Sequence, residues 1–593
     1  MSADAGLFMR ASVARGLDAT ASSHDDALMA THVDQAQGLL RESRAAMALT
    51  RWDEARQIAE RAAALEPEDA EILEAWGEAA FFSGHRAATF EAGERAYRRY
   101  RELGNDLGSA RVAILIANAS YDFTGDIPVA RGWIGRALRW LEGAEPSREL
   151  AFVYGFDGHL AIFREQRPAH ALARAEQAAD IARSLGDIDM EMTAVALQGL
   201  ARSSMGQVDA GTALLDEACA SLMSGEVEDP LLGSLILCYV VAACDRTRDF
   251  ERADTWCRAM TDMCVRWSID SMVASCRTQY ASVLFSRGTW DEAEVELETA
   301  AASLGAERPG MAADAIVRLG ELRRRQGRIA EAESLSTQAD SHTHRAQAYP
   351  RVLLLRAGIA LDRGLPAEAS TLAKRYLRAV DPHDQALRVP GLELEVRAAV
   401  ASGRIDERTD EALEELREAA SSVGTLPLRG SARFAEGTVY ATRGDGGRSK
   451  AALEDAVDLF LRAGTPFEEA EARAALASVL AYLGDEAQSE VEAEAAGRTF
   501  ARLGAIENAA RAAALIHAGP PVAPRDTAGL SRREREVLSL VATGASNVEI
   551  STALFLSVRT VERHVSNIYV KLGVSGKTAR VIAAEHAHRL GLA

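Results

Sequence analysis

The chain repeats a short turn signal every 37 to 41 residues over most of its length. Each signal places Gly or a polar residue at the turn and, in most cases, Ala about five residues later, as in "GTWDEA" from Gly288. One interval accommodates two helices of roughly 15–18 residues with their turns. Because a single helical hairpin cannot bury its apolar face, neighbouring hairpins must stack on one another. The period therefore predicts an all-α solenoid, with turns at positions 84, 125, 166, 206, 247, 288, 327, 364, 403, 444 and 484 and an earlier turn at Thr50.

The turn signal also indicates the type of repeat. Gly supplies the positive φ that ends a helix, and the Asp or Glu that often follows favours the start of the next helix. The Gly-x-x-x-x-Ala turn resembles the tetratricopeptide-like superfamily, although the period is longer than the usual 34 residues. HEAT or armadillo repeats are the alternative subtype, since their period is close to 40. We expect residues 25–518 to form about twelve tetratricopeptide-like hairpins that act as a sensor or interaction region, after a disordered N-terminus over residues 1–24.

Acidic charge is unevenly distributed along the chain. The net charge is −20, but from Leu530 onward 9 Lys and Arg residues stand against 5 Asp and Glu residues, which leaves −24 on the first 529 residues. Any nucleic-acid contact is therefore expected to be confined to the basic C-terminal segment. The sequence contains no run of 18 apolar residues and begins without a basic and apolar leader. These features predict a cytoplasmic protein that does not bind membranes.

The sequence offers no catalytic or metal-binding motif. "GKT" from Gly576 resembles the end of a phosphate-binding loop, but the first Gly of such a loop would stand at position 571, which is Lys571. The six cysteines form no C-x-x-C pair, and His342 and His344 have no third ligand close in sequence. We therefore expect a protein without enzymatic activity, cofactor or metal ion.

A second domain is expected after the segment "GPPVAPRDTAG", a Pro- and Gly-rich linker over residues 519–529. In residues 530–593 the capping boxes "SRRE" and "SNVE" each start a helix, and Ser557 starts a third helix over residues 558–572. Apolar residues of this third helix recur at spacings of three and four, which predicts a buried stripe; its members are Val558, Val561, Val565, Ile568 and Leu572. A short helix, a tight turn and a helix with a polar opposite face are typical of helix-turn-helix DNA-binding domains.

The segment "LSRREREVLSLVATGASNVEISTALFLSVRTVERHVSNIYVKLGV" resembles the LuxR-type DNA-binding domain through "REREVL", "G-x-SN-x-EI", "S-x-x-TV-x-x-H" and "KLGV". The resemblance implies that the third helix reads DNA and that the last helix, "KTARVIAAEHAHRLGL", mediates dimerisation. Arg580 stands where the family commonly has a small residue. The side chains expected to face bases are Glu562, Arg563, Ser566 and Asn567. Those expected to approach phosphates are Ser546, Asn547, Arg559, Thr560, Lys571 and Lys577.

The two regions together resemble the large LuxR regulators related to the maltose-regulon activator, although this chain has no phosphate-binding loop for an ATPase module. The resemblance implies a transcription activator whose solenoid senses a small-molecule or protein effector and controls the DNA-binding domain. Its expected partners are double-stranded DNA, RNA polymerase and a second copy of the chain. The alternative function is a tetratricopeptide-like scaffold regulated by a partner protein, with DNA binding only as an anchor.

Soft and aromatic side chains are concentrated in the central repeats, whereas the rest of the array is rich in Ala, Leu and Val. Cys, Met, Trp and Tyr adapt to apolar ligands and are common in pocket walls. We therefore expect an effector pocket in these repeats, although packing between helices explains the same pattern. The candidate residues are Trp256, Cys257, Met260, Cys264, Trp267, Cys276 and Tyr280.

Overall fold

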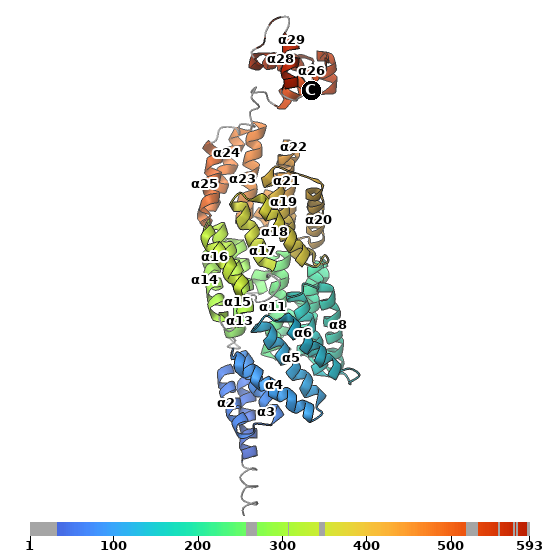
Figure 1. Cartoon of the computed structure of the whole chain (residues 1–593), viewed down its shortest axis with the longest axis vertical. Coiled ribbons are helices and arrows are strands. Elements are labelled where there is room, and N and C mark those ends of the chain that lie inside the picture. The colour runs from blue at the N-terminus through green and yellow to red at the C-terminus, as the bar shows by residue number, and fades with distance from the viewer. Residues whose placement is uncertain are drawn as a thin grey trace, which may run out of the picture. The chain divides into compact units, whose positions relative to one another are not determined.

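The computed structural model describes residues 32–256, 270–305, 308–342, 350–517, 532–554, 558–572, 574, 576 and 579–589. In these ranges all regular structure is helical (Figure 1), so the predicted all-α class is confirmed. The chain divides into two compact units. One, here called the solenoid unit, comprises Met1–Leu480 and Ala487–Ala514, and the other, the C-terminal unit, comprises Ala481–Glu486 and Leu515–Ala593.

Up to residue 517 the described chain is a succession of helices joined by short turns. They are α2 (Trp52–Leu65), α3 (Ala70–Phe82), α4 (Arg86–Glu102), α5 (Asp106–Asp122), α6 (Ile127–Trp140), α7 (Arg148–Phe163), α8 (Pro168–Leu185), α9 (Ile188–Ser204), α10 (Val208–Ser224), α11 (Pro230–Thr247), α13 (Asp270–Arg287), α14 (Trp290–Leu304), α15 (Pro309–Arg325), α16 (Ile329–His342), α17 (Pro350–Asp362), α18 (Pro366–Ala379), α19 (Gln385–Ser402), α20 (Glu407–Val423), α21 (Leu426–Thr442), α22 (Gly446–Ala463), α23 (Pro466–Leu483), α24 (Glu486–Leu503) and α25 (Ile506–His517). Residues 32–48 and 250–256 are also helical.

A residue with positive φ occupies every hairpin turn that the sequence predicts. Glycine fills this position in nine turns, because it adopts the left-handed conformation without strain. Thr50, Gln166 and Arg248 are the other described residues with positive φ, at 58°, 54° and 55°. They lie in the three turns where the sequence has a polar residue instead of Gly. The turn positions are thus confirmed, with the turn near position 247 centred one residue later.

Five residues after most of these turns stands an alanine with no exposed surface. A small side chain here allows the second helix of a hairpin to pack directly against the first. The alanines at this position are Ala55, Ala130, Ala171, Ala253, Ala293, Ala332 and Ala369, each 0% exposed. In the α9–α10 hairpin the equivalent residue is Gly211, where an added Cβ would lie 2.6 Å from the carbonyl oxygen of Gly199.

Replacing Gly211 by Ala is expected to destabilise the solenoid unit. Ala is the better helix former, but its methyl group would contact the backbone of α9, which cannot move aside as a side chain can. Overpacking of this kind costs about 1–3 kcal/mol of unfolding free energy. Gly132→Ala in α6 is the matched control, because nothing lies within 4 Å of the added Cβ, and it should stabilise by about 0.5–1 kcal/mol. Thermal unfolding of both variants checks this, and shifts in the same direction would contradict it.

Helix α11 lies in the core of the solenoid unit. By length and composition it is the one helix among the described residues that could cross a membrane, with a mean hydropathy of 1.3. However, 67% of its residues are buried inside the protein. Packing between helices therefore accounts for its apolar character.

Repeats that are distant in sequence touch one another within the solenoid unit. Arg308 donates to the carbonyl oxygen of Phe81 at 2.6 Å, and Thr425 donates to that of Thr247 at 2.7 Å. One apolar cluster joins α13, α14 and α15 to α23, α24 and α25, and includes Trp290, Phe467 and Phe500. In Figure 1 these orange helices lie above the green ones. The array is therefore coiled tightly enough for its C-terminal repeats to pack on its central repeats.

Candidate DNA-binding site

Four helices of the C-terminal unit pack around one apolar core. They are α26 (Arg532–Ala542), α27 (Asn547–Ala553), α28 (Val558–Leu572) and α29 (Ala579–Arg589). The buried core residues come from all four helices and are Val537, Leu538, Val541, Ile550, Val561, Val565, Ile568, Ala583 and Ala587. This core fixes α27 and α28 against α26 and α29, so that the outer face of α28 can be presented rigidly.

The turn before α27 has the predicted cap. Gly544, with φ of 84°, follows the end of α26, and Ser546 is the N-cap of α27. The backbone N–H of Glu549 donates to Oγ of Ser546 at 3.3 Å, and the backbone N–H of Ser546 donates to Oε2 of Glu549 at 2.7 Å. These hydrogen bonds form a capping box and lower the pKa of Glu549. The capping box predicted from "SNVE" is confirmed.

The apolar stripe of α28 is shorter than the sequence predicts. Val561, Val565 and Ile568 are buried, and Leu572 is half-buried. Val558 is 38% exposed because it is the first residue of the helix and lies at the edge of the core.

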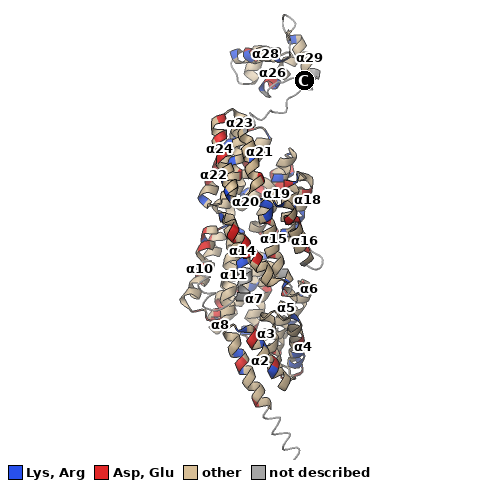
Figure 2. Cartoon of the chain, turned by 90° about the vertical axis from the view of Figure 1, so that its left-hand side faces the viewer, with Lys and Arg blue, Asp and Glu red and all other residues tan. Residues whose placement is uncertain are grey.

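The opposite face of α28 carries exposed polar side chains. Arg559, Glu562, Arg563, Ser566 and Asn567 are all exposed. Neither arginine forms an ion pair with another residue that the structure describes. Figure 2 shows basic residues on α28. A helix held by one face and exposing such groups on the other has the form of a helix-turn-helix recognition helix.

Two residues expected to approach phosphates hold the helices of the C-terminal unit together. Asn547 accepts a hydrogen bond of 3.0 Å from Arg580, which also donates to the carbonyl oxygen of Ala545. Arg580 thereby fastens α29 to the start of α27. Lys571 donates from Nζ to Oε2 of the buried Glu534 at 2.6 Å. Phosphate binding by Asn547 and Lys571 stays a prediction, and it would require these intramolecular hydrogen bonds to break or to be shared with the phosphate.

The remaining predicted residues of this region are only partly described. Ser546 is exposed, and Thr560 is half-buried on α28. Ser557 and Lys577 lie outside the described residues, as does Ser531 of the "SRRE" capping box. On α29, Val581 is 63% exposed whereas Ala583 and Ala587 are buried in the core.

Comparison with known families identifies the type of domain in the C-terminal unit. Residues 528–584 match the family described as bacterial regulatory proteins of the luxR family, also named GerE. The C-terminal unit contains a LuxR-type DNA-binding domain. This LuxR-type domain is 43% identical over 75 residues to the transcriptional regulatory protein LiaR of Bacillus subtilis, covering 13% of this chain and 33% of LiaR. It is 49% identical over 55 residues to the response regulator protein VraR of Staphylococcus aureus, covering 9% of this chain and 26% of VraR. The chain thus spans only a quarter to a third of the relatives it matches.

The solenoid unit is matched by solved structures at low identity. The Cut9–Hcn1 complex of the APC/C aligns over 83% of this chain and 98% of that chain, with 12% identity and a TM-score of 0.33. Yeast Tom70 aligns over 74% of this chain and 95% of that chain, with 15% identity and a TM-score of 0.29. The helices and turns of this unit themselves show that it consists of stacked hairpins.

The residues predicted to form an effector pocket are only partly described. Cys257, Met260, Cys264 and Trp267 lie outside the described residues, and so does the side chain of Cys276. Trp256 and Tyr280 are half-buried and pack against the apolar cluster that contains Phe250 and Tyr239. These two side chains therefore contribute to packing between helices, and a ligand-binding role for the set remains a prediction.

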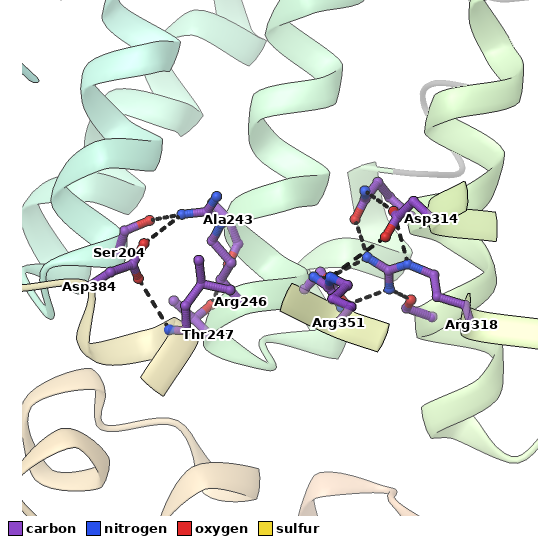
Figure 3. Close-up of polar contacts among 12 residues, drawn as sticks. Ser204, Ala243, Arg246, Thr247, Asp314, Arg318, Arg351 and Asp384 are labelled. Carbon is purple, nitrogen blue, oxygen red and sulfur yellow. Dashed lines mark hydrogen bonds and ion pairs between the residues drawn. The ribbon is translucent and has the colours of Figure 1, made fainter. Parts of the chain in front are cut away.

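A buried network of arginines crosses the interior of the solenoid unit. Arg246 on α11 donates to Oδ2 of Asp384 at 3.1 Å and to Oγ of Ser204 at 2.8 Å. Figure 3 shows this group beside a second one, in which Arg318 and Arg351 converge on acidic side chains. Both arginines contact Oδ2 of Asp245, at 3.0 and 3.1 Å.

Burial and ion pairing act in opposite directions on the carboxylates of this network. Burial raises the pKa of Asp384 to about 6 although Arg246 counteracts it. For Glu321 burial again raises the pKa, but Arg324 and Arg325 outweigh burial and bring it to about 2. The carboxylates held by two arginines thus stay ionised well below neutral pH, whereas Asp384, held by one arginine, takes up a proton as the pH falls through about 6.

This network surrounds a cavity of about 310 Å³. Its described lining includes seven arginines and five carboxylates, and three further carboxylates outside the lining, Asp314, Asp362 and Asp384, pair with these arginines. The arginines are Arg246, Arg248, Arg318, Arg324, Arg325, Arg351 and Arg397. The sequence patterns did not predict this site. The signal available was the pair Arg318 and Arg325, which stand seven residues apart on the core-facing side of α15.

Proposed function

We propose that this protein is a cytoplasmic, non-enzymatic transcription activator in which the solenoid unit senses an effector and controls a LuxR-type DNA-binding domain. The observation that carries the proposal is the exposed polar face of α28, with two arginines that form no ion pair with another described residue. Arginine is the side chain most often used to read guanine in the major groove. The proposed partners are duplex DNA, RNA polymerase, an effector and a second copy of the chain.

The effector and the dimer are supported by less direct observations. An arginine-lined cavity of about 310 Å³ inside the solenoid unit has the size of a small-molecule site. Val581 is exposed on α29, the helix that the family resemblance associates with dimerisation. A dimer of helix-turn-helix domains would read two half-sites about one helical turn apart.

Selection of DNA sequences by the full-length protein tests this proposal. We expect an enriched inverted repeat that binds the full chain and not a chain ending at residue 517, which retains α2 to α25 and lacks the LuxR-type domain. Fluorescence anisotropy with the selected duplex and a scrambled duplex, at several salt concentrations, measures the specific and the electrostatic contributions separately. Equal binding of both duplexes, or equal binding by the shortened chain, would contradict the proposal.

A further inference from the structure

The arginine-lined cavity combines cationic and apolar walls. Besides its seven arginines it is lined by Phe250, Phe285, Phe434 and Phe460. Arg325 lies between two aromatic rings, with Cζ at 4.6 Å from the ring centre of Phe285 and 4.3 Å from that of Phe467. Stacking on aromatic rings holds a guanidinium group in place and leaves its edge for hydrogen bonds, which Arg325 makes to Glu321 and Glu468. Such a wall suits a ligand that has both an anionic group and an apolar body.

Arg397 is the arginine of this cavity with the most hydrogen-bonding capacity left. It donates through Nη2 to Glu471 and stacks on Phe434 at 5.5 Å. Among the described residues its Nε and Nη1 donors have no acceptor, and its side chain is 35% exposed. By contrast, Arg324 uses three nitrogens on Glu321 and Asp362. An anion entering the cavity can therefore bond to Arg397 without first displacing a carboxylate.

A second cavity shares this wall. It measures about 210 Å³, and Arg324, Arg325, Arg397 and Glu471 line both cavities. Arg511 also lines the smaller one, together with the carboxylates Asp362 and Glu507. The shared wall therefore presents cationic groups to ligand-sized spaces on both sides.

We propose that the effector is a small organic anion with an apolar portion, and that it binds in the larger cavity with its anionic group on Arg397. That the bound anion acts as an effector rests on the proposed function. That an anion binds here rests on the cavity alone. The site also offers a route for a response. Arg248 holds Glu393 on α19 and Ser431 on α21, and Arg325 holds Glu468 on α23. Because these bonds join the central repeats to the C-terminal repeats and line the same cavity as Arg397, an anion bound there would alter the charge balance between the two sets of repeats and so how they pack.

A matched pair of dyes tests the anion requirement. 1-Anilinonaphthalene-8-sulfonate and N-phenyl-1-naphthylamine share one aromatic frame, but only the first carries a sulfonate. In fluorescence titrations of the full-length protein we expect one saturable sulfonate-dye site per chain, with the neutral dye binding at least about tenfold more weakly, a difference of about 1.4 kcal/mol. Equal affinities for the two dyes would overturn the inference.

Variants of the cavity wall locate the site. Arg397→Gln should weaken binding of the sulfonate dye about tenfold and remove the preference over the neutral dye, whereas Arg397→Lys should keep part of the preference. Ser286→Phe, which narrows the cavity from α13, should weaken both dyes. Arg375→Gln is the control, because Arg375 is exposed on α18 and does not line the cavity. If Arg397→Gln binds the sulfonate dye as tightly as the unmodified protein, the assignment is wrong.

Two further measurements keep the outcome unambiguous. Thermal melts followed by circular dichroism identify any misfolded variant. This control matters because partly unfolded proteins bind the sulfonate dye without a specific site. If Arg397→Gln is misfolded, Arg397→Lys and Ser286→Phe provide the test. DNA binding is measured on the same samples. Loss of dye selectivity with intact specific DNA binding overturns only the cavity site. Intact dye selectivity without specific DNA binding overturns the proposed function and leaves the anion site standing.

Discussion

Replacing Arg246 by methionine is expected to lower the unfolding free energy of the solenoid unit by about 3–5 kcal/mol. The side chain of Arg246 is 7% exposed, and that of its partner Asp384 is 0% exposed. Methionine retains most of the apolar contact of the arginine stem with its neighbours but leaves a buried carboxylate without its cation. Loss of one partner from a buried pair costs far more than loss of an exposed ion pair.

The pH dependence of this variant gives a second readout. The pKa of Asp384 is about 6 in the folded protein, above the roughly 3.9 of an unfolded chain. The folded state thus holds this proton more tightly, so the contribution of Asp384 to stability falls as the pH rises from about 4 to about 6. Without Arg246 the folded pKa should rise further. The variant should therefore be more destabilised at pH 8 than at pH 5, as measured by chemical denaturation at both pH values.

Two control variants separate the charge from the packing. Arg443→Met removes an arginine whose ion pair with Asp410 is exposed, and should cost less than about 1 kcal/mol. Adding Asp384→Asn to Arg246→Met removes the unpaired charge, while asparagine still caps α19 by accepting from the N–H of Leu387. The double variant should recover most of the lost stability at pH 8. No recovery would mean that the arginine acts through its shape instead of its charge.

Replacing Arg563 by glutamate is expected to abolish specific DNA binding. The arginine is exposed on α28 and has no partner among the described residues, so its replacement should leave the fold intact. Arg563→Ala should weaken the preferred site by about 1–3 kcal/mol and relax specificity at one base pair. The glutamate adds repulsion from the phosphates, and juxtaposed like charges cost several kcal/mol more.

Binding is measured by fluorescence anisotropy with the selected duplex and with single-base variants of it. Arg408→Glu in the solenoid unit is the control for net charge, because Arg408 is exposed on α20 and has no role in the proposed interface. Equal loss of affinity in both glutamate variants would show that overall charge matters instead of a contact by α28. Unchanged binding by Arg563→Glu would contradict the assignment of α28 as the recognition helix.

Local sequence patterns predicted the turns of this protein well, because each depends on residues close in the chain. The positive φ at Gln166 and Arg248 follows from their place in the repeat, although neither is glycine. The predicted buried stripe of α28 wrongly included Val558, because a periodic pattern does not show where the core ends. The helical period that predicts the buried stripe also places Arg563 and Asn567 on the opposite side of the helix, so their exposure could be expected.

The cavity of the solenoid unit could not be predicted in the same way. Its arginines find their partners in other repeats: Arg248 bonds to Glu393 and Arg246 to Asp384. Repeat spacing predicts which helices form a hairpin, but it does not predict how tightly the array coils or which interior residues meet. Likewise, Arg580 is an unusual residue for its position, and only its bonds to Asn547 and Ala545 show what it does.

The arginine contacts between distant repeats also affect how this array unfolds. In an open solenoid each repeat depends only on its neighbours, and a chain shortened at one end remains a smaller version of itself. Here, removal of the chain from Asp384 onward would leave Arg246 without Asp384 and Arg248 without Glu393. The central repeats would then contain unpaired buried cations. Stability is thus shared between the central and the C-terminal repeats, so that these two parts should melt together and resist being divided into independently folding pieces.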